Sequence, residues 1–445
     1  MSQQPTHPDI SNPSRRDFLV KTAAAAGALA VGGGSIRAQG KQRAVPKVGT
    51  KSPLGADEPI NMGIIGTGGM GSGHLRSTCG QGFPKKGDRK EHVRIVALSD
   101  VCKPRLDRAN KVATERQTGV KVDSYRNYKD LLARDDIHCV LIASPEHWHA
   151  QMAVDAIAVG KDVYLEKPMT LRLDDALWLK RVMEANPHMR LQVGTQYMMR
   201  EKYRHARKLI ADGVIGHPTL SQTSYCRNSV KGEWLYGIDK KVQPGEMLDW
   251  DAWLGDLEAR PFDTEIYHRW RRYKDFSTGI IGDLLVHMMT PLLYALDVGW
   301  PIRVSASGGH YCDKAMENHD QVNLQVEFEK DHTMIVAGST CNEQGLEAMI
   351  RGHKANLYLG SNNCVMRPER LFVDDVDPKT VNCKKINEQP ALRLDWFNAV
   401  RTRSQNFSQV SHATKIMVAV DLATRSIWNG PAYQFDPKSL EASAC

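Results

Sequence analysis

The chain has 445 residues, of which 41% are hydrophobic and 25% are charged, and its formal net charge is +8. This length exceeds one ordinary hydrophobic core, so two domains and a tail are expected. Eight of the lysines and arginines lie in residues 1–51 beside only two aspartates, which leaves a charge of +2 for the rest of the chain. The composition therefore argues against a nucleic-acid-binding protein, and no apolar run is long enough to span a membrane.

The first 38 residues resemble a twin-arginine export signal. The run Ser-Arg-Arg-Asp-Phe-Leu-Val-Lys at 14–21 is followed by a weakly apolar stretch over 22–36 and by small residues around Ala38. We therefore expect residues 1–38 to be a signal peptide and the mature protein to be periplasmic or secreted after export in the folded state. A disordered basic leader is the alternative. Residues 39–58 are polar and read as a linker.

The first predicted strand, over 59–65, runs directly into a glycine-rich turn. The next six residues are Gly66, Thr67, Gly68, Gly69, Met70 and Gly71, a G-x-G-x-x-G pattern that opens a helix through about Cys79. Such glycines let the pyrophosphate of a dinucleotide approach the backbone N–H groups at a helix N-terminus. The place of the turn between a strand and a helix predicts dinucleotide binding.

A second strand over 93–99 follows a polar insertion at 80–92 and ends at Asp100. A carboxylate at this place accepts hydrogen bonds from the adenosine ribose hydroxyls and repels a 2′-phosphate, which favours NAD over NADP. Lys103 and Arg105 are close enough to weaken that preference, so NADP stays an alternative. Asp100 can also cap the helix predicted from Pro104, and the two roles are compatible.

A strand, a helix and a second strand follow over 138–143, 149–159 and 162–165, and they form one predicted βαβ unit. Ligands of open parallel sheets bind at the carboxyl ends of the strands. The turns at 144–149 and 166–167 should therefore face the same crevice.

Three further runs make the sequence similar to a known family. Tyr-Lys-Asp-Leu-Leu at 128–132, Ala-Ser-Pro-Glu-His-Trp-His-Ala at 143–150 and Gly-Lys-Asp-Val-Tyr-Leu-Glu-Lys-Pro at 160–168 resemble the Gfo/Idh/MocA oxidoreductases. The resemblance implies an α/β protein with an NAD-binding Rossmann domain, here 59–180, and then an α+β domain with an open, mostly antiparallel sheet, here 181–432. It also implies a homo-oligomer, a dimer or a tetramer. Residues 433–445 are then a tail.

The second half of the chain alternates strand and helix patterns. Strands are expected at 219–225, 302–310, 321–328, 333–339 and 356–359, and helices at 173–185, 203–212, 279–297, 392–402 and 412–428. Residues 228–278 have few periodic signals but contain seven tryptophans and tyrosines. This aromatic content is unlike that of a solvated linker, so we expect the segment to form a wall of the substrate pocket.

Three residues are candidates for chemistry on a hydroxyl group, which requires a base for the proton and a cation or donor on the oxygen. Lys167 ends a strand at the crevice. Asp283 and His287 lie one helical turn apart and so share a helix face, and Gly-Asp-x-x-x-His matches the catalytic pair of the family. We predict that His287 is the base, that Asp283 orients it and that Lys167 polarises the oxygen. The alternatives are a surface lysine and a core histidine.

The other site predictions concern the cofactor, the substrate and metals. The cofactor residues are expected to be Gly66, Thr67, Gly68, Gly69, Met70, Gly71, Asp100, Ser144, Pro145, His147, His149, Glu166 and Lys167. The substrate residues are expected to be Tyr197, Arg200, Tyr267, His268 and Arg269. No metal site is predicted, because His147 and His149 lack a third partner and the nine cysteines show no C-x-x-C spacing. That spacing does not indicate a disulfide framework either.

Three functions fit these residues. The leading hypothesis is a secreted NAD-dependent oxidoreductase that acts on a small carbohydrate, namely a sugar, a polyol or a glycoside. The second is an NAD-dependent glycoside hydrolase, which would oxidise the sugar transiently, eliminate the aglycone and return the hydride with the same three residues. The third is a non-catalytic sugar-binding protein. Net formation of NADH separates the first from the second, and turnover that depends on Lys167 or His287 would contradict the third.

Overall fold

The computed structural model describes residues 43–55, 57–79, 92–117 and 119–445. The expected signal peptide and most of the polar insertion at 80–92 lie outside these residues. The chain divides into one unit over Met1–Ala44 and a second over Val45–Cys445. All that follows concerns the second unit.

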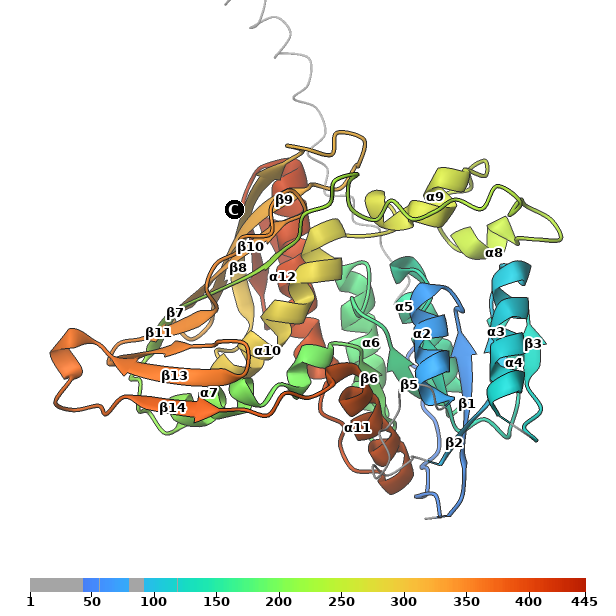
Figure 1. The fold of residues 1–445 in the computed structure, drawn as a ribbon, viewed down its shortest axis with the longest axis horizontal. Coiled ribbons are helices and arrows are strands. Elements are labelled where there is room, and N and C mark those ends of the chain that lie inside the picture. The colour runs from blue at the N-terminus through green and yellow to red at the C-terminus, as the bar shows by residue number, and fades with distance from the viewer. Residues whose placement is uncertain (1–42, 56, 80–91, 118) are drawn as a thin grey trace, which may run out of the picture. The chain divides into compact units, whose positions relative to one another are not determined.

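A six-stranded parallel sheet in the order β3-β2-β1-β4-β5-β6 forms the N-terminal domain (Figure 1). Its strands are β1 (Ile60–Ile65), β2 (Val93–Ser99), β3 (Asp123–Tyr125), β4 (Cys139–Ile142), β5 (Asp162–Leu165) and β6 (Leu191–Val193). Successive residues of β4 belong to different hydrophobic clusters: Val140 and Ile142 pack with α5, whereas Cys139 and Leu141 pack with α3 and α11. Burial on both faces explains why this strand is a continuous apolar run.

Helices connect these strands, because two parallel strands cannot be joined by a tight hairpin and need a longer crossover connection. They are α2 (Gly69–Thr78), α3 (Lys103–Arg116), α4 (Tyr128–Leu132), the 3₁₀ turn η1 (Glu146–Trp148), α5 (His149–Ala158) and α6 (Leu173–Ala185). The predicted βαβ unit is confirmed as β4, α5 and β5, and β4 pairs with β5 in parallel. Because β6 pairs with β5, the parallel sheet extends past residue 180, where the domain boundary was expected.

A ten-stranded sheet in the order β14-β13-β12-β11-β7-β10-β9-β8-β15-β16 forms the C-terminal domain. Its strands are β7 (Pro218–Cys226), β8 (Pro301–Gly309), β9 (Gln321–Phe328), β10 (His332–Ser339), β11 (Met349–Gly352), β12 (Ala355–Tyr358), β13 (Asn363–Pro368), β14 (Lys379–Asn382), β15 (Tyr433–Asp436) and β16 (Glu441–Ala444). All neighbouring pairs are antiparallel except β7 and β10, which confirms the mostly antiparallel sheet. Residues 433–445, expected as a tail, instead supply two strands at one edge.

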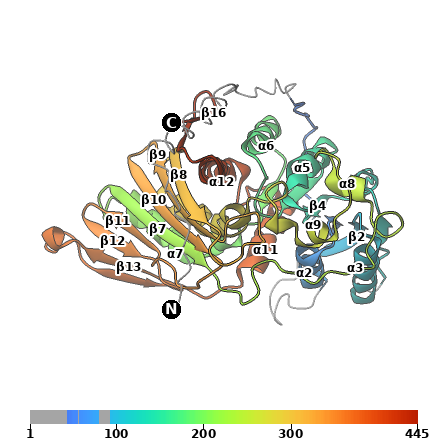
Figure 2. The ribbon, with the colours of Figure 1, turned by 90° about the horizontal axis from the view of Figure 1, so that it is seen from above.

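Helices lie against one face of this sheet, with α12 (Val410–Asn429) along β8 and β15 (Figure 2). The helical elements are η2 (Gln196–Met199), α7 (Glu201–Ala211), α8 (Trp250–Leu254), α9 (Thr264–Arg269), η3 (Trp270–Arg272), the π-helix η4 (Ile280–Leu285), α10 (Val286–Leu296), η5 (Arg370–Phe372), α11 (Glu388–Thr402) and α12 (Val410–Asn429). None of the helices in the described ranges combines the length and the apolar character needed to cross a bilayer. The nine cysteines are free thiols.

Residues 239–273, which we call the cap, lie over the carboxyl end of the parallel sheet. Figure 1 shows α8 and α9 of the cap above α3 and α2 of the N-terminal domain. The backbone of Lys103 donates to the carbonyl of Met247 at 2.9 Å, and that of Asp249 donates to the carbonyl of Val101 at 3.1 Å. Aromatic and aliphatic side chains from the cap and Cys102 form a hydrophobic cluster of their own. The segment expected to wall the substrate pocket therefore also covers the nucleotide-binding domain.

The buried His332 makes the C-terminal domain sensitive to acid. Its ring bonds to Ser221 Oγ at 2.8 Å and to the carbonyl of Pro218, and burial lowers its pKa to about 4. The folded pKa lies below the unfolded value of about 6.5, so the stabilisation is complete above pH 6.5 and is lost as the pH falls toward 4. We expect His332 alone to cost about 2 kcal/mol of unfolding free energy between pH 7 and pH 5. Urea titrations at both pH values should show a smaller loss for His332→Gln than for the wild type, and equal losses would contradict this prediction.

Candidate active site

A cavity of about 640 Å³ runs along the carboxyl ends of the parallel strands, within the size range of small-molecule sites. The glycine-rich turn and Asp100 line one end, Ser144 lines the middle, and Lys167 and Arg271 line the other end. The cap forms the opposite wall through Trp253, Tyr267, His268 and Trp270. The predicted turns at 144–149 and 166–167 thus do face one crevice, as expected from the sequence.

The glycine-rich turn offers the space that a dinucleotide requires. A Cβ added at Gly68 would meet only Nη1 of Arg105, at 3.6 Å, and one added at Gly69 would meet nothing within 4 Å. Gly68 is the residue before α2, so the free N–H groups of the helix N-terminus point into this space. The guanidinium of Arg105, stacked 4.8 Å from the ring centre of Tyr267, adds positive charge beside it. These residues fit a pyrophosphate, and Arg105, which the sequence analysis placed near the ribose hydroxyls, lies beside the glycine-rich turn.

Asp100 stabilises the same turn. Its Oδ2 accepts hydrogen bonds from the backbone N–H of Thr67 at 2.7 Å and from the Thr67 hydroxyl at 2.9 Å, while Oδ1 accepts from the N–H of Cys102 at 2.8 Å. The predicted capping role is not confirmed, because Cys102 is the N-cap residue of α3 and no side chain caps this helix; the bond to the Cys102 N–H instead fixes the turn before it. Each carboxylate oxygen has further lone-pair sites, so ribose hydroxyls can still bind here.

The open space at Gly68 gives a direct test of cofactor binding. We expect Gly68→Ala to leave the melting temperature within a degree or two, because its methyl group meets no backbone atom in the structure. The same methyl group would occupy the space of the pyrophosphate, so NAD affinity should fall at least about tenfold, or 1.4 kcal/mol. Isothermal titration measures the change. Gly73→Ala, on α2 with no atom within 4 Å of the added Cβ, is the matched control; equal NAD affinity in both variants would contradict the prediction.

Lys167 and Asp283 form a buried ion pair at the end of the cavity. Nζ of Lys167 donates to Oδ1 of Asp283 at 2.8 Å and to its backbone carbonyl at 2.8 Å. Nε of Arg271 donates to the same Oδ1 at 3.0 Å. Burial alone would raise the pKa of Asp283, but the Lys167 ammonium and the Arg271 guanidinium hold it far below its usual range. The carboxylate is therefore ionised and fixes two cations beside the crevice.

The π-helix η4 brings Asp283 to Lys167. Pi-helical turns are rare and occur often at functional sites, because they change the direction of side chains within a helix. A Cβ at Gly282 would lie 1.8 Å from Oγ1 of Thr278 and 3.5 Å from Cγ of Pro168. The Thr278 side chain therefore leaves room only for glycine at this position, whereas Pro168 lies at an ordinary van der Waals distance. The sequence pattern predicts one regular helix here and misses the π-helix.

His287 lies on α10, four residues after Asp283, and is 7% exposed. Its ring centre is 5.3 Å from that of Tyr197 and 6.0 Å from that of Tyr225. No hydrogen bond to the imidazole arises within the described residues, and Nδ1 is fully buried. Burial, together with the Lys167 ammonium, lowers the pKa of His287 to about 3, so the ring is neutral at pH 7. Asp283 and His287 do not line the cavity but lie behind its Lys167 end.

Glu146 is a buried carboxyl group next to this cluster that the sequence analysis did not assign to the site. It is 1% exposed, and it accepts hydrogen bonds from the Ser277 hydroxyl at 2.6 Å and from the N–H of Thr278 at 3.3 Å. These residues precede η4, so Glu146 links the β4–α5 turn to the helix that carries Asp283. Burial and the nearby Asp283 carboxylate raise its pKa to about 7. A polar residue in a turn after a strand gives no sequence signal of such a contact.

The other predicted turn residues divide into lining and supporting groups. Glu166 lines the cavity and bonds to His74 Nε2 at 2.7 Å. His149 lines it too; its Nδ1 lies 2.8 Å from the Pro168 carbonyl and its Nε2 lies 3.0 Å from the Ser144 carbonyl, so the ring sits between the two turns and donates to one of them. His147 does not line the cavity, contrary to expectation; its Nε2 bonds to the carbonyl of Trp253 in the cap at 2.9 Å.

The predicted substrate residues are only partly together. Tyr197 lies beside His287, and the guanidinium of Arg200 lies 3.5 Å from the ring centre of Tyr197. Arg200 also pairs with Glu388 at 2.9 Å. Tyr267 and His268 line the nucleotide cavity instead. Arg269 does not line this cavity; its Nη1 donates to both carboxylate oxygens of Glu265 at 2.8 Å, one turn earlier on the same helix. Arg271, two residues later, is the arginine that reaches Asp283.

Two family profiles and several known proteins match the chain. Residues 60–195 match a profile described as oxidoreductase family, NAD-binding Rossmann fold, and residues 199–443 match one described as oxidoreductase family, C-terminal alpha/beta domain. A glycosyl hydrolase family 109 protein of Shewanella baltica is 28% identical over 298 residues, which cover 64% of this chain and 60% of that protein. An inositol 2-dehydrogenase of Serratia proteamaculans is 32% identical over 202 residues, which cover 44% of this chain and 55% of that protein.

The fold is also that of known structures. Levoglucosan dehydrogenase in complex with NADH superposes with a TM-score of 0.62 at 16% identity, covering 84% of this chain and 98% of that chain. The alignment to the sequence relatives is shorter, since it spans about 60% of the length of the family 109 protein.

Proposed function

Because the chain belongs to the Gfo/Idh/MocA family of oxidoreductases and contains its NAD-binding Rossmann domain, we propose that it transfers hydride between a carbohydrate hydroxyl and a tightly held NAD. The substrate would be a sugar, a polyol or a glycoside. The observation that carries this proposal is the buried Lys167–Asp283 pair, 2.8 Å long, with the neutral His287 one turn further along the helix. A cation and a neutral imidazole beside a nucleotide crevice are the groups that alcohol oxidation needs.

Each of these residues has a role that follows from its surroundings. NAD, when bound, supplies the hydride acceptor. Lys167, held by Asp283 and Arg271, would place its ammonium on the substrate oxygen as negative charge develops there. His287 would accept the hydroxyl proton, because its ring is unprotonated and its nitrogens are bonded to no described residue. The rings of Tyr197 and Tyr225 beside it suit the apolar faces of a sugar.

The cap supports the proposal that the cofactor is retained between turnovers. Its backbone is bonded to the nucleotide-binding domain at Val101 and Lys103, and Arg126 donates to the carbonyl of Glu246 at 2.8 Å. Trp148, which lines the cavity, donates to the carbonyl of Trp253 at 2.8 Å. A dinucleotide beneath these contacts can leave only when several of them break together.

A retained cofactor favours one alternative, the glycoside hydrolase. The family 109 relatives support it, since their similarity spans 64% of this chain. In such a cycle the hydride returns to the substrate, so NAD need never leave the covered crevice. The same three residues would serve, with His287 and Lys167 acting on the oxygen of the carbon that is first oxidised and then reduced.

One experiment tests the proposal and separates the alternatives. The protein is purified without added nucleotide and denatured, and any released cofactor is identified by mass spectrometry. We expect about one NAD(H) per chain. The loaded protein is then incubated with sugars, polyols and glycosides: net NADH or reduction of a second substrate indicates an oxidoreductase, and free sugar without net reduction indicates the hydrolase. An empty protein that binds NAD only weakly would contradict the retained cofactor, and no turnover on any substrate class would favour a sugar-binding protein.

We also propose that the protein is exported folded, with its cofactor inside, and that it assembles as a dimer or tetramer. The sequence pattern of residues 14–38, an arginine pair followed by an apolar stretch and small residues, supports export. Replacing Arg15 and Arg16 by lysines should keep the full-length protein in the cytoplasm. Light scattering on the purified protein determines the oligomeric state. A mass of one chain would contradict the assembly.

A further inference from the structure

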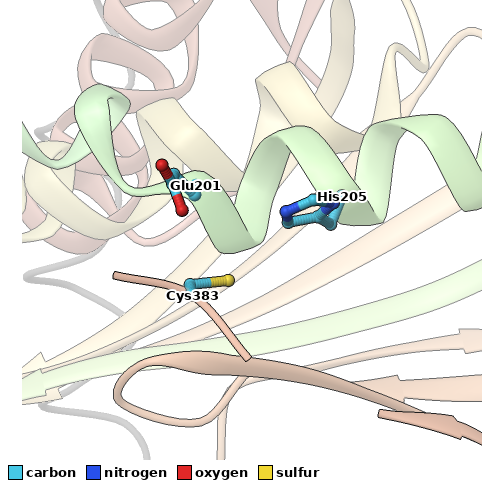
Figure 3. Close-up of side chains that lie close together, drawn as sticks. All are labelled: Glu201, His205 and Cys383. Atoms are coloured by element: carbon cyan, nitrogen blue, oxygen red, sulfur yellow. The ribbon is translucent and has the colours of Figure 1, made fainter. Parts of the chain in front are cut away.

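Three side chains with metal-binding atoms meet on the outer side of α7, away from the cavity. Glu201 and His205 lie on successive turns of this helix, and Cys383 directly follows β14, the edge strand of the ten-stranded sheet. Figure 3 shows the carboxylate and the imidazole above Cys383, whose sulfur points toward the ring of His205. The three donor atoms lie within 4.8 Å of one another, and all three residues are half-buried.

The donor atoms have few other partners. Among the described residues, His205 makes no hydrogen bond and no ion pair, and Glu201 accepts one hydrogen bond, from the N–H of Lys384 at 3.2 Å. The thiol of Cys383 has only a long contact of 3.9 Å to the carbonyl of Val381. Three half-buried groups with unused lone pairs therefore face one common point.

The set of donors has the chemistry of a zinc site. We propose that Glu201, His205 and Cys383 bind a divalent transition metal, with Zn²⁺ the ion that fits best, and thereby fix the β13–β14 edge to α7. Thiolate, imidazole and carboxylate together are typical zinc ligands, whereas Mg²⁺ and Ca²⁺ prefer oxygen ligands alone. Two ligands come from one rigid helix face at i and i+4, and the third comes from a strand that packs against that helix. Three protein ligands leave the fourth tetrahedral position to water.

Neighbouring charges are compatible with a cation at this point. Arg200 is paired with Glu388 at 2.9 Å, and the ammonium of Lys202 donates to the carbonyls of Leu359 at 3.2 Å and Gly360 at 2.6 Å. Burial and the Glu201 carboxylate raise the pKa of the Cys383 thiol, so the metal would displace its proton on binding.

A second group of donors in the described part of the chain, Cys312, Asp320 and Cys341, suits a metal less well. The carboxylate of Asp320 already accepts hydrogen bonds from the N–H groups of Tyr311, Cys312 and Asp313 at 2.7 to 2.8 Å. This group serves as an internal comparison for the experiment.

The test uses the full-length protein, stripped with a chelator and titrated with Co²⁺. We expect a thiolate-to-cobalt charge-transfer band in the near ultraviolet that saturates at one Co²⁺ per chain and is abolished by Cys383→Ser and by His205→Ala. Cys226→Ser removes a half-buried thiol outside the cluster and should retain the full band. The absence of a band, a band that survives Cys383→Ser, or a band that is lost in Cys312→Ser would overturn the assignment.

A second measurement needs no variant. With one equivalent of Zn²⁺, alkylation of Cys383 by iodoacetamide should slow at least about tenfold, because a metal-bound thiolate is shielded from the reagent. Peptide mass spectrometry reads each cysteine separately, and Cys226 and Cys312 should react as fast as without zinc. An alkylation rate at Cys383 that is the same with and without Zn²⁺ would overturn the proposal. Both readouts are independent of turnover, so their outcome does not depend on whether the proposed oxidoreductase activity is correct.

Discussion

Lys167→Met is expected to lower kcat by about 10²- to 10³-fold, the typical effect of removing one preorganised donor to a developing oxyanion. Methionine fills a similar volume without the charge. Because Lys167 lines the crevice and its Nζ is held 2.8 Å from Asp283, its ammonium is fixed in place before substrate binds. Steady-state kinetics on the substrate found in the panel measures the loss. The NAD content of the purified variant should stay near one per chain, because the glycine-rich turn is untouched.

Two further variants separate chemistry from folding. Removing Lys167 leaves the buried Asp283 with Arg271 as its remaining charged partner, and an uncompensated buried charge destabilises the fold. The double variant Lys167→Met with Asp283→Asn removes that charge too, and it should regain melting temperature without regaining turnover. Lys129→Met, at an exposed position on α4, is the matched control and should turn over at the wild-type rate. Turnover of Lys167→Met within threefold of wild type would contradict the role assigned to the ammonium.

Much of the fold follows from local sequence patterns. The strand at 60–65, its glycine-rich turn and the βαβ unit around Ser144 are short-range features, because alternation, glycine placement and apolar runs determine them within thirty residues. The parallel order of the strands and the crevice at their carboxyl ends then follow from general rules of such sheets. Of the two strands at 433–445, β15 was missed because its partner β8 is more than one hundred residues away in sequence, and β16 pairs only with β15.

The contacts that complete the site are long-range and leave no local pattern. Arg271 stands in the run Arg-Trp-Arg-Arg, where nothing distinguishes it from Arg269; only the folded cap directs one arginine to Asp283 and the other to Glu265. Glu146 meets Ser277 across 131 residues. Composition and periodicity likewise do not distinguish the π-helix from a regular α-helix.

Replacing His287 by glutamine is expected to lower kcat by about 10²- to 10⁴-fold, the usual range for losing a general base. Glutamine keeps a polar side chain of similar reach but cannot take up a proton. Substrate affinity should change much less, since the rings of Tyr197 and Tyr225 remain. Comparison of kcat with KM on the same substrate measures the two effects. A variant that loses affinity but keeps kcat would assign His287 to substrate binding instead.

The pH dependence makes the role of His287 sharper. Burial and the Lys167 ammonium lower its pKa to about 3, so the base form is complete from pH 5 upward, and kcat should show no acid limb near 6.5 that belongs to this residue. A ring with so low a pKa is a weak base in the resting site. Negative charge develops on the substrate oxygen as its hydroxyl proton moves to the ring, and this charge would stabilise the protonated ring until the hydride leaves the carbon. We instead expect an acid limb near pH 7 that comes from Glu146, because burial and the Asp283 carboxylate raise the pKa of Glu146 to about 7. Glu146→Gln should abolish that limb and His287→Gln should leave it in the residual activity; a limb that disappears with His287 instead would show that the histidine titrates during turnover.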